Sequence, residues 1–267
     1  MERGEDRAHP EWHVAASAAE FAQIGADVVQ ETWTAVAPRP ILVATGSTPM
    51  PIYAELARRA AVGAFAVPDS PVVQLDEYVG IDEDDPRSLY GWMRRGFLEP
   101  LAIPDRSVIR LHGDAPEPAA ECARFEAAVE QAGGLGLAVL GLGPNGHVGF
   151  NEPPSAANAP SRPVALTPES LESNAHYWQG RAVPDEALTT GMSLILAADI
   201  VVLVVSGGHK RSILERTVLG PESDDVPASH LRRSPRFVVV ADTHAADGLL
   251  GRAAIQYDRQ YQRDTTA

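Results

Sequence analysis

The feature that most constrains this chain is a recurring unit: a short apolar run, a loop that contains glycine, and a segment with helical periodicity. Clear copies of the apolar run lie at residues 40–44, 137–142 and 200–205. Uninterrupted apolar runs of this length are typical of strands buried on both faces, as in parallel sheets covered by helices. The sequence therefore predicts an α/β fold with a mostly parallel sheet and helices on both of its faces.

Five strands and four helices are expected, and together they form a single domain over residues 1–267. The expected strands are residues 40–44, 72–75, 137–142, 200–205 and 237–241, and the expected helices are residues 15–36, 52–61, 117–132 and 209–219. No stretch has the composition of an interdomain linker. Polar tails are expected at about residues 1–12 and 258–267.

Composition narrows the class of protein and its partners. The 267 residues carry a formal net charge of −14, and 45% of them are hydrophobic. An acidic chain of ordinary hydrophobicity is expected to be globular and to bind neither nucleic acid nor an anionic membrane. Its one cysteine, Cys122, excludes an internal disulfide and a cysteine-clustered metal site, and it favours a reducing compartment.

Neither a signal peptide nor a membrane span is expected, so the predicted location is cytoplasmic. The first ten residues are polar and charged and lack the apolar core of a signal sequence. No apolar run approaches the roughly 20 residues that a membrane span needs. No metal-binding or dinucleotide-binding motif stands in register, and we expect neither a metal nor a cofactor.

Ligands of such sheets bind outside the carboxyl ends of the strands, which draws attention to four loops. They are residues 45–49, 76–80, 143–152 and 206–210. The first combines Gly46 with the hydroxyls of Ser47 and Thr48 ahead of a helix, an arrangement that can bind phosphate. The alternative is that one of the hydroxyls only caps the helix.

The second loop begins with the adjacent carboxylates Asp76 and Glu77. A shielded carboxylate can act as a general base, because burial raises its pKa. Neighbours in a strand point to opposite faces, so only one of the two is expected to face the cleft. The alternative is an exposed acidic turn that continues into residues 82–85.

The third loop brings Asn145, His147 and Glu152 together within a few residues. Histidine moves protons near neutral pH, and a nearby carboxylate can orient its ring. We interpret this loop as catalytic; the alternative is a glycine-rich turn in which the histidine has only structural partners.

The fourth loop ends in Lys210, the only lysine of the chain. It opens an expected helix, where the macrodipole disfavours a cation. This position predicts an anionic partner, and the alternative is an ordinary surface lysine.

Taken together, these segments closely resemble the glucosamine-6-phosphate deaminase (glucosamine/galactosamine-6-phosphate isomerase) family. The matching motifs are ATGSTP, LDEYVG, GLGPNGHVGFNEP and SGGHK, in that order, at residues 44–49, 75–80, 141–153 and 206–210. The segment VPDEALTTGMSLILAA at residues 183–198 resembles a further family motif. The resemblance spans about residues 41–242 and implies a Rossmann-like three-layer α/β sandwich.

The resemblance also implies a reaction, the conversion of glucosamine 6-phosphate and water into fructose 6-phosphate and ammonium without a metal. By the same resemblance, Asp76 transfers the proton between C2 and C1, His147 opens the sugar ring, and Glu152 supports His147. The matching phosphate site consists of Gly46, Ser47, Thr48 and Lys210.

Several positions depart from the family pattern. Asn145 stands where many members have Asp, so charge support for His147 is expected from Glu152 instead. His176 stands where the family usually has a phosphate-binding Arg, and a histidine reaches less far and is only partly charged near neutral pH. The basic positions around residues 161–167 are also altered, so we expect no allosteric activation by N-acetylglucosamine 6-phosphate.

Three alternatives stay open on the sequence. Galactosamine 6-phosphate is an alternative substrate, given His176 and the altered loop after Glu152. A 6-phosphogluconolactonase would share the fold and the phosphate loop but lacks the paired LDEYVG and GFNEP motifs. A non-catalytic sugar-phosphate sensor is the third. The expected partner is a small sugar phosphate in every case.

Overall fold

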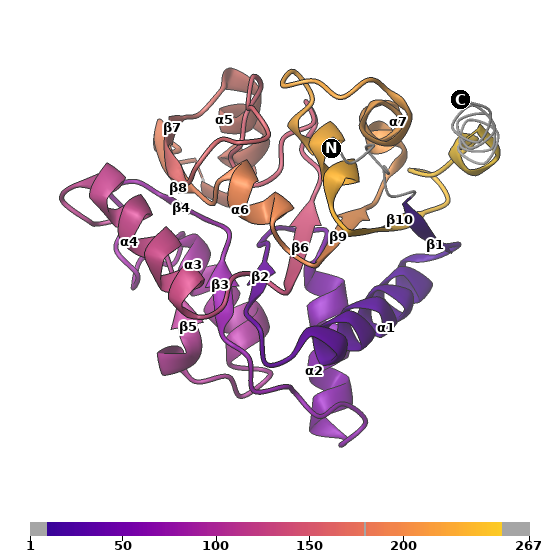
Figure 1. The fold of residues 1–267 in the computed structure, drawn as a ribbon, viewed down its shortest axis with the longest axis horizontal. Helices are drawn as coiled ribbons and strands as arrows, with labels where there is room; N and C mark the ends of the chain where they lie inside the picture. Colours follow the sequence, from indigo (N-terminus) through magenta and orange to yellow (C-terminus); the bar gives the residue numbers. More distant parts are fainter. Residues whose placement is uncertain (1–9, 179, 253–267) are drawn as a thin grey trace, which may run out of the picture.

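A seven-stranded parallel sheet runs through the middle of the molecule (Figure 1). The computed structural model describes residues 10–178 and 180–252. The strands lie in the order β1-β10-β9-β6-β2-β3-β5, and every neighbouring pair is parallel, as predicted. Their bounds are β1 (Glu11–Ala15), β2 (Ile41–Val43), β3 (Val72–Gln74), β5 (Val108–Ile109), β6 (Leu137–Gly141), β9 (Ile200–Val205) and β10 (Arg236–Asp242).

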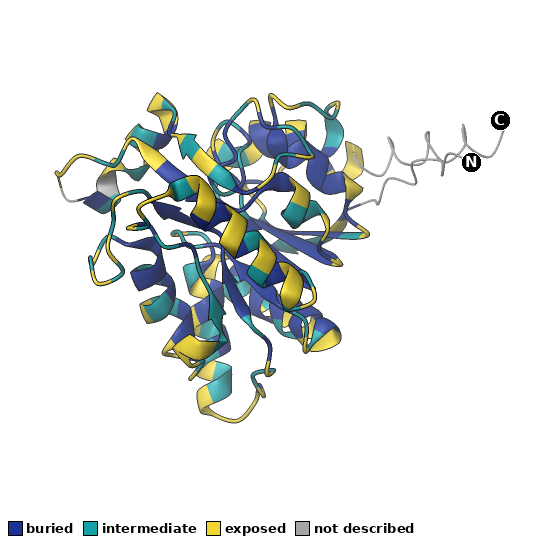
Figure 2. Ribbon diagram, turned by 60° about the vertical axis from the view of Figure 1, so that its left-hand side comes forward, coloured by how far each residue is buried: buried dark blue, intermediate teal, exposed yellow. Residues whose placement is uncertain are grey.

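Each face of this sheet has its own apolar core, because successive residues of a strand point to opposite faces. In β9, Val201 and Leu203 belong to one cluster of buried side chains, whereas Val202 and Val204 belong to the other. All six residues of β9 are buried. Figure 2 shows buried strands beneath helices whose outward sides are exposed. Burial on both faces is the reason that the strand consists of an uninterrupted apolar run.

Helices cover both faces and complete the three-layer arrangement. The face with Val202 is covered by α1 (Ala18–Val36), α2 (Met50–Ala61), α3 (Leu89–Met93) and the π-helical turn η1 (Arg94–Leu98). The face with Val201 is covered by α4 (Pro118–Gln131), α6 (Met192–Leu196), α7 (Arg211–Leu219) and the 3-10 segment η5 (Pro227–Arg233). Shorter 3-10 turns are η2 (Asp105–Ser107), η3 (Ala175–Trp178) and η4 (Gly208–Lys210).

A second, antiparallel sheet of three short strands lies beside the first. It consists of β4 (Asp76–Tyr78), β8 (Glu186–Thr189) and β7 (Arg162–Ala165), with β8 in the centre. Together with α5 (Pro168–Asn174) it encloses a small apolar cluster that includes Tyr78, Phe150 and Trp178. Only Leu75 separates β3 from β4, so the chain passes from the main sheet to the small one at Asp76.

The structure corrects several expected boundaries. Residues 11 and 12 belong to β1, an edge strand, and not to an N-terminal tail. The expected strand at 72–75 is β3, but a second strand, β4, follows it in the segment expected as a loop and belongs to the other sheet. The expected C-terminal tail, 258–267, lies outside the described residues. Within the described part of the chain, no helix is both long and apolar enough to cross a membrane.

One glycine sets the distance between α1 and α2. A Cβ atom at Gly25 would lie 2.4 Å from Cδ1 and 2.6 Å from Cγ1 of the buried Ile52. We expect Gly25→Ala to destabilise the protein by about 1–3 kcal/mol through overpacking, and Ile52→Ala by about 2–5 kcal/mol through a cavity. Because the two changes compensate in space, the double variant should lose less than the sum of both, measured by denaturant unfolding. Strict additivity would contradict this packing.

Candidate functional site

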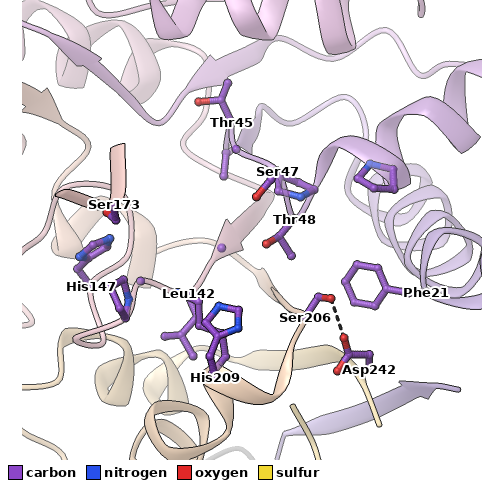
Figure 3. A pocket seen from close by; sticks show the side chains of 18 of the residues that line it. Phe21, Thr45, Ser47, Thr48, Leu142, His147, Ser173, Ser206, His209 and Asp242 are labelled. Atoms are coloured by element: carbon purple, nitrogen blue, oxygen red, sulfur yellow. Dashed lines mark hydrogen bonds between the residues drawn. The ribbon is translucent and has the colours of Figure 1, made fainter. Parts of the chain in front are cut away.

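A cavity of about 750 Å³ opens at the carboxyl ends of β2, β6 and β9 (Figure 3). Its wall contains residues from all four loops that the sequence singled out. Asp76, His147 and Lys210 lie on it, as do Gly46, Ser47 and Thr48. Asn145 and Glu152 are not part of the wall and instead contact His147 from behind. Eight of the nine predicted site residues are thus brought together in one place.

The ninth, His176, lies in η3, and its side chain falls outside the described part of the chain. Its neighbours Ser173, Asn174 and Tyr177 line the cavity. The phosphate contact expected of His176 therefore stays a prediction.

The loop between β2 and α2 carries the hydroxyl groups of Ser47 and Thr48, and neither of them caps the helix. Gly46 has a φ of +135°, a conformation that residues with a side chain rarely adopt. The residue that caps α2 is Pro49, and no side chain donates or accepts a capping hydrogen bond there. The alternative in which Ser47 or Thr48 caps the helix is therefore wrong. Both side chains lie at the cavity wall (Figure 3), where their hydroxyls can meet a ligand.

Lys210 is a half-buried cation without a carboxylate partner among the described residues. Burial lowers the pKa of its ammonium group. Asp242, an acidic residue of the same cavity wall, is already engaged, since it accepts hydrogen bonds from Ser206 Oγ at 2.6 Å and Gly207 N at 2.7 Å (Figure 3). An unpaired, partly desolvated ammonium group favours the binding of an anion.

Asp76 and Glu77 point to opposite sides of β4, as predicted. Asp76 is only 8% exposed and lines the cavity. Burial, followed by the charge of Glu77, raises the pKa of Asp76 to about 8. None of the described residues donates a hydrogen bond to its carboxyl group. The reading of this segment as an exposed acidic turn is wrong, because both carboxyl groups are buried.

Glu77 faces away from the cavity and fixes the start of α3. Its carboxyl oxygens accept hydrogen bonds from Tyr78 N, Leu89 N, Tyr90 N, Ser88 Oγ and Gln74 Nε2, at 2.7–3.2 Å. Burial raises the pKa of Glu77, and these hydrogen bonds oppose the rise. The two adjacent carboxyl groups therefore have opposite surroundings, one rich in donors and one without any.

His147 is held by a buried carboxylate on the side away from the cavity. Its Nδ1 lies 3.2 Å from Glu152 Oε2. Burial disfavours the charge of Glu152, but hydrogen bonds from His147, Ser170 and Asn145, with the charge of His147, lower its pKa to about 2. An ionised Glu152 accepts a hydrogen bond from Nδ1–H, which leaves Nε2 without a partner among the described residues.

Asn145 supports this pair as a neutral donor. Its Nδ2 donates to Glu152 Oε2 at 2.9 Å, and its Oδ1 accepts from the backbone N–H of His147 at 3.2 Å. The expectation that Glu152, and not residue 145, faces the imidazole with a charge agrees with this geometry.

The sequence did not predict three further contributors to the site. Ser170 of α5 donates to Glu152 Oε1 from 18 residues away. Asp242, at the end of β10, holds the loop that leads to Lys210. Gly143 packs under the His147 ring, because a Cβ there would lie 2.2 Å from its Cδ2 and Nε2. Only Gly143 left a signal in the sequence, because it is a glycine directly after an expected strand and shortly before His147.

No group of three or more potential metal ligands is found within residues 10–178 and 180–252. The cavity wall holds two kinds of functional group. Asp76 and His147 carry groups that can transfer protons, and Lys210 with the loop around Gly46 carries groups that can bind an anion.

Known proteins share both sequence and fold with the chain. Residues 12–239 match the family described as glucosamine-6-phosphate isomerases/6-phosphogluconolactonase. Glucosamine-6-phosphate deaminase from Cutibacterium acnes is 39% identical over 212 residues, which cover 79% of this chain and 81% of the relative. The enzyme of that name from Streptomyces coelicolor is 38% identical over 209 residues, covering 78% and 80%.

Solved structures give the same result for the fold. A monomeric glucosamine-6-phosphate deaminase superposes with a TM-score of 0.84 at 30% identity, over 88% of this chain and 98% of that one. A 6-phosphogluconolactonase from Trypanosoma cruzi superposes with a TM-score of 0.70 at 18% identity, over 90% and 97%. The second likeness concerns the fold alone. On these matches and the site geometry, the chain belongs to the family of glucosamine-6-phosphate isomerases and 6-phosphogluconolactonases.

Proposed function

We propose that this protein converts glucosamine 6-phosphate and water into fructose 6-phosphate and ammonium. The observation that carries the proposal is that one cavity wall holds both kinds of group. It has an unpaired lysine and a loop with free hydroxyls, and it also has a buried carboxyl group of raised pKa and a histidine that a buried carboxylate holds. A sugar that is bound through its phosphate and reacts at other atoms fits this combination.

The phosphate is bound by Lys210, the backbone N–H groups around Gly46 and the hydroxyls of Ser47 and Thr48. It is not altered in the reaction, so its binding energy can hold the sugar against the reacting groups. Phosphate binding by His176 is part of this proposal.

His147 opens the sugar ring. Its Nε2 takes the proton of the C1 hydroxyl and gives a proton to the ring oxygen as the bond from C1 to that oxygen breaks, which yields the open-chain aldehyde and returns the imidazole to its starting form. Glu152 supports this step because an ionised carboxylate on Nδ1 stabilises the imidazolium form and fixes the orientation of the ring.

Asp76 then moves one proton between adjacent carbons. Its carboxylate removes the proton from C2, which is acidified by the neighbouring aldehyde, and returns it to C1. The product is an imine at C2. Water adds to that carbon, the C–N bond breaks, and nitrogen leaves as ammonium, so that fructose 6-phosphate remains. No oxidant or reductant is needed.

The first prediction concerns the reaction and its base. Purified protein should release ammonium from glucosamine 6-phosphate, and Asp76→Asn should lower kcat by about 10²–10⁴-fold with little change in KM. Ammonium release is measured in parallel with galactosamine 6-phosphate, and lactone hydrolysis with 6-phosphogluconolactone. Absence of ammonium release from both hexosamine phosphates would contradict the proposed function, and faster release from galactosamine 6-phosphate would assign the other epimer.

The second prediction concerns pH. The base must be ionised, and a raised pKa means that Asp76 keeps its proton up to about pH 8. The value of kcat/KM, which reports the free enzyme, should therefore fall about tenfold per unit as the pH decreases below about 8. A decline that begins only near pH 4 would show that the group is not Asp76 in its buried state.

The third prediction concerns phosphate binding. Lys210→Met should raise KM for glucosamine 6-phosphate by about 10- to 100-fold, because a hydrogen bond to a charged group is lost. Lys210→Arg, which keeps the charge, is the matched control and should lose less. With glucosamine, which has no phosphate, the two variants should equal the unmodified protein. A similar loss with glucosamine would mean that Lys210 acts elsewhere.

A further inference from the structure

Asp76 and Glu77 are neighbours in one strand, yet the protein treats their carboxyl groups in opposite ways. Five donors converge on the two oxygens of Glu77. The carboxyl group of Asp76 receives no donor from the described residues, although it lies at the wall of a cavity that contains other polar side chains. Two buried, neighbouring carboxyl groups repel each other when both are ionised, so the charge of one favours a proton on the other.

The hydrogen bonds decide which of the two groups keeps that proton. Oε1 of Glu77 accepts from Tyr78 N and Leu89 N, and Oε2 accepts from Ser88 Oγ, Tyr90 N and Gln74 Nε2. A carboxylate is an acceptor only, and a proton on either oxygen would face donors that are already there. Glu77 is therefore the ionised member, and the proton resides on Asp76.

Other charges around Asp76 do not compensate for Glu77. On β4 itself the titratable neighbours are Glu77 and Tyr78, and β8 faces Asp76 with Thr189. The titratable side chains of the cavity wall besides Asp76 are His147, Tyr177, His209, Lys210, Asp242 and His244. The causes that raise the pKa of Asp76 are its burial and Glu77. The site thus lacks a built-in cation for Asp76 among the described residues.

We propose that Glu77 is a positioning residue whose fixed negative charge, added to the burial of Asp76, keeps a proton on Asp76 in the empty site, so that a sugar phosphate with an ammonium group at C2 is needed to turn Asp76 into the base. The inference rests on the proposed function, in which Asp76 takes the proton from C2.

In this arrangement the substrate itself converts Asp76 into the carboxylate that then acts as the base. The ammonium group is attached to the carbon that Asp76 deprotonates, so it arrives within a few ångströms of the carboxyl group. Its charge stabilises the carboxylate, and the proton of Asp76 passes to the solvent as the sugar binds. A hydroxyl at C2 cannot do this. Hexose phosphates without an amine therefore meet a protonated Asp76, which is a poor base.

The decisive experiment counts protons on binding to the unmodified protein. The ligands are 2-amino-2-deoxyglucitol 6-phosphate and glucitol 6-phosphate, open-chain alcohols that differ only at C2 and have no carbonyl to react. Calorimetry at pH 6.5, in buffers of different ionisation enthalpy, gives the protons released by each. Both ligands carry the same phosphate, so any protons that the phosphate releases cancel when one proton count is subtracted from the other. We expect the amino ligand to release close to one additional proton and to bind more tightly, and Asp76→Asn to abolish the additional release. Equal proton counts for the two ligands would overturn the proposal.

A second arm tests Glu77 itself. Glu77→Gln should move the acid limb of kcat/KM downwards by a pH unit or more, because the neighbouring charge is gone. Ser88→Ala is the matched control, since it removes one donor from Glu77 but keeps both carboxyl groups. It should lower the melting temperature and leave the acid limb in place. A folded Glu77→Gln protein with an unmoved limb would overturn the role of Glu77. If that variant does not fold, the proton count decides alone.

These outcomes are separable from failure of the proposed function. An unmodified protein that releases no ammonium from hexosamine phosphates contradicts the function. A protein that releases ammonium but shows the same proton count with both alditols keeps the function and loses the inference.

Discussion

The hydrogen bonds that converge on the buried carboxylate of Glu77 are the interaction on which the site depends. They tie the junction between the main sheet and the small sheet to the first turn of α3. Two residues of that segment, Leu89 and Trp92, form part of the cavity wall. The same bonds settle which way β4 faces, and so they leave Asp76 turned into the cavity. The buried charge of Glu77 thus sets the orientation of Asp76 and the electrostatics around its carboxyl group.

The parts of the fold that were predictable are those with a strong periodic signal. The central strands β6 and β9 are buried on both faces, and the segments that directly follow them are rich in glycine. The alternation of side chains along a strand was enough to separate Asp76 from Glu77. At the active-site loop, the density of polar side chains indicated chemistry before any geometry was available.

The parts that were missed depend on tertiary contacts. The strand β1 is a five-residue edge strand with a polar start, and it is stabilised by pairing with β10 at the other end of the chain. The three strands of the small sheet have three or four residues each, too few for a periodic pattern. The hydroxyl of Ser170 reaches Glu152 only after α5 packs against the loop. No local pattern in the sequence encodes such a partner.

The order of the strands has a consequence for the size of molecule that fits. Three of the loops that line the cavity follow β2, β6 and β9, which are consecutive neighbours in the sheet. Adjacent strands are about 4.8 Å apart, so the loops after β2 and β9 emerge roughly 10 Å from each other on either side of β6. The spacing of the strands therefore fixes the distance between these two loops. Loop substitutions can change which chemical groups are recognised, whereas a substrate of a different width would require loops from a different pair of strands.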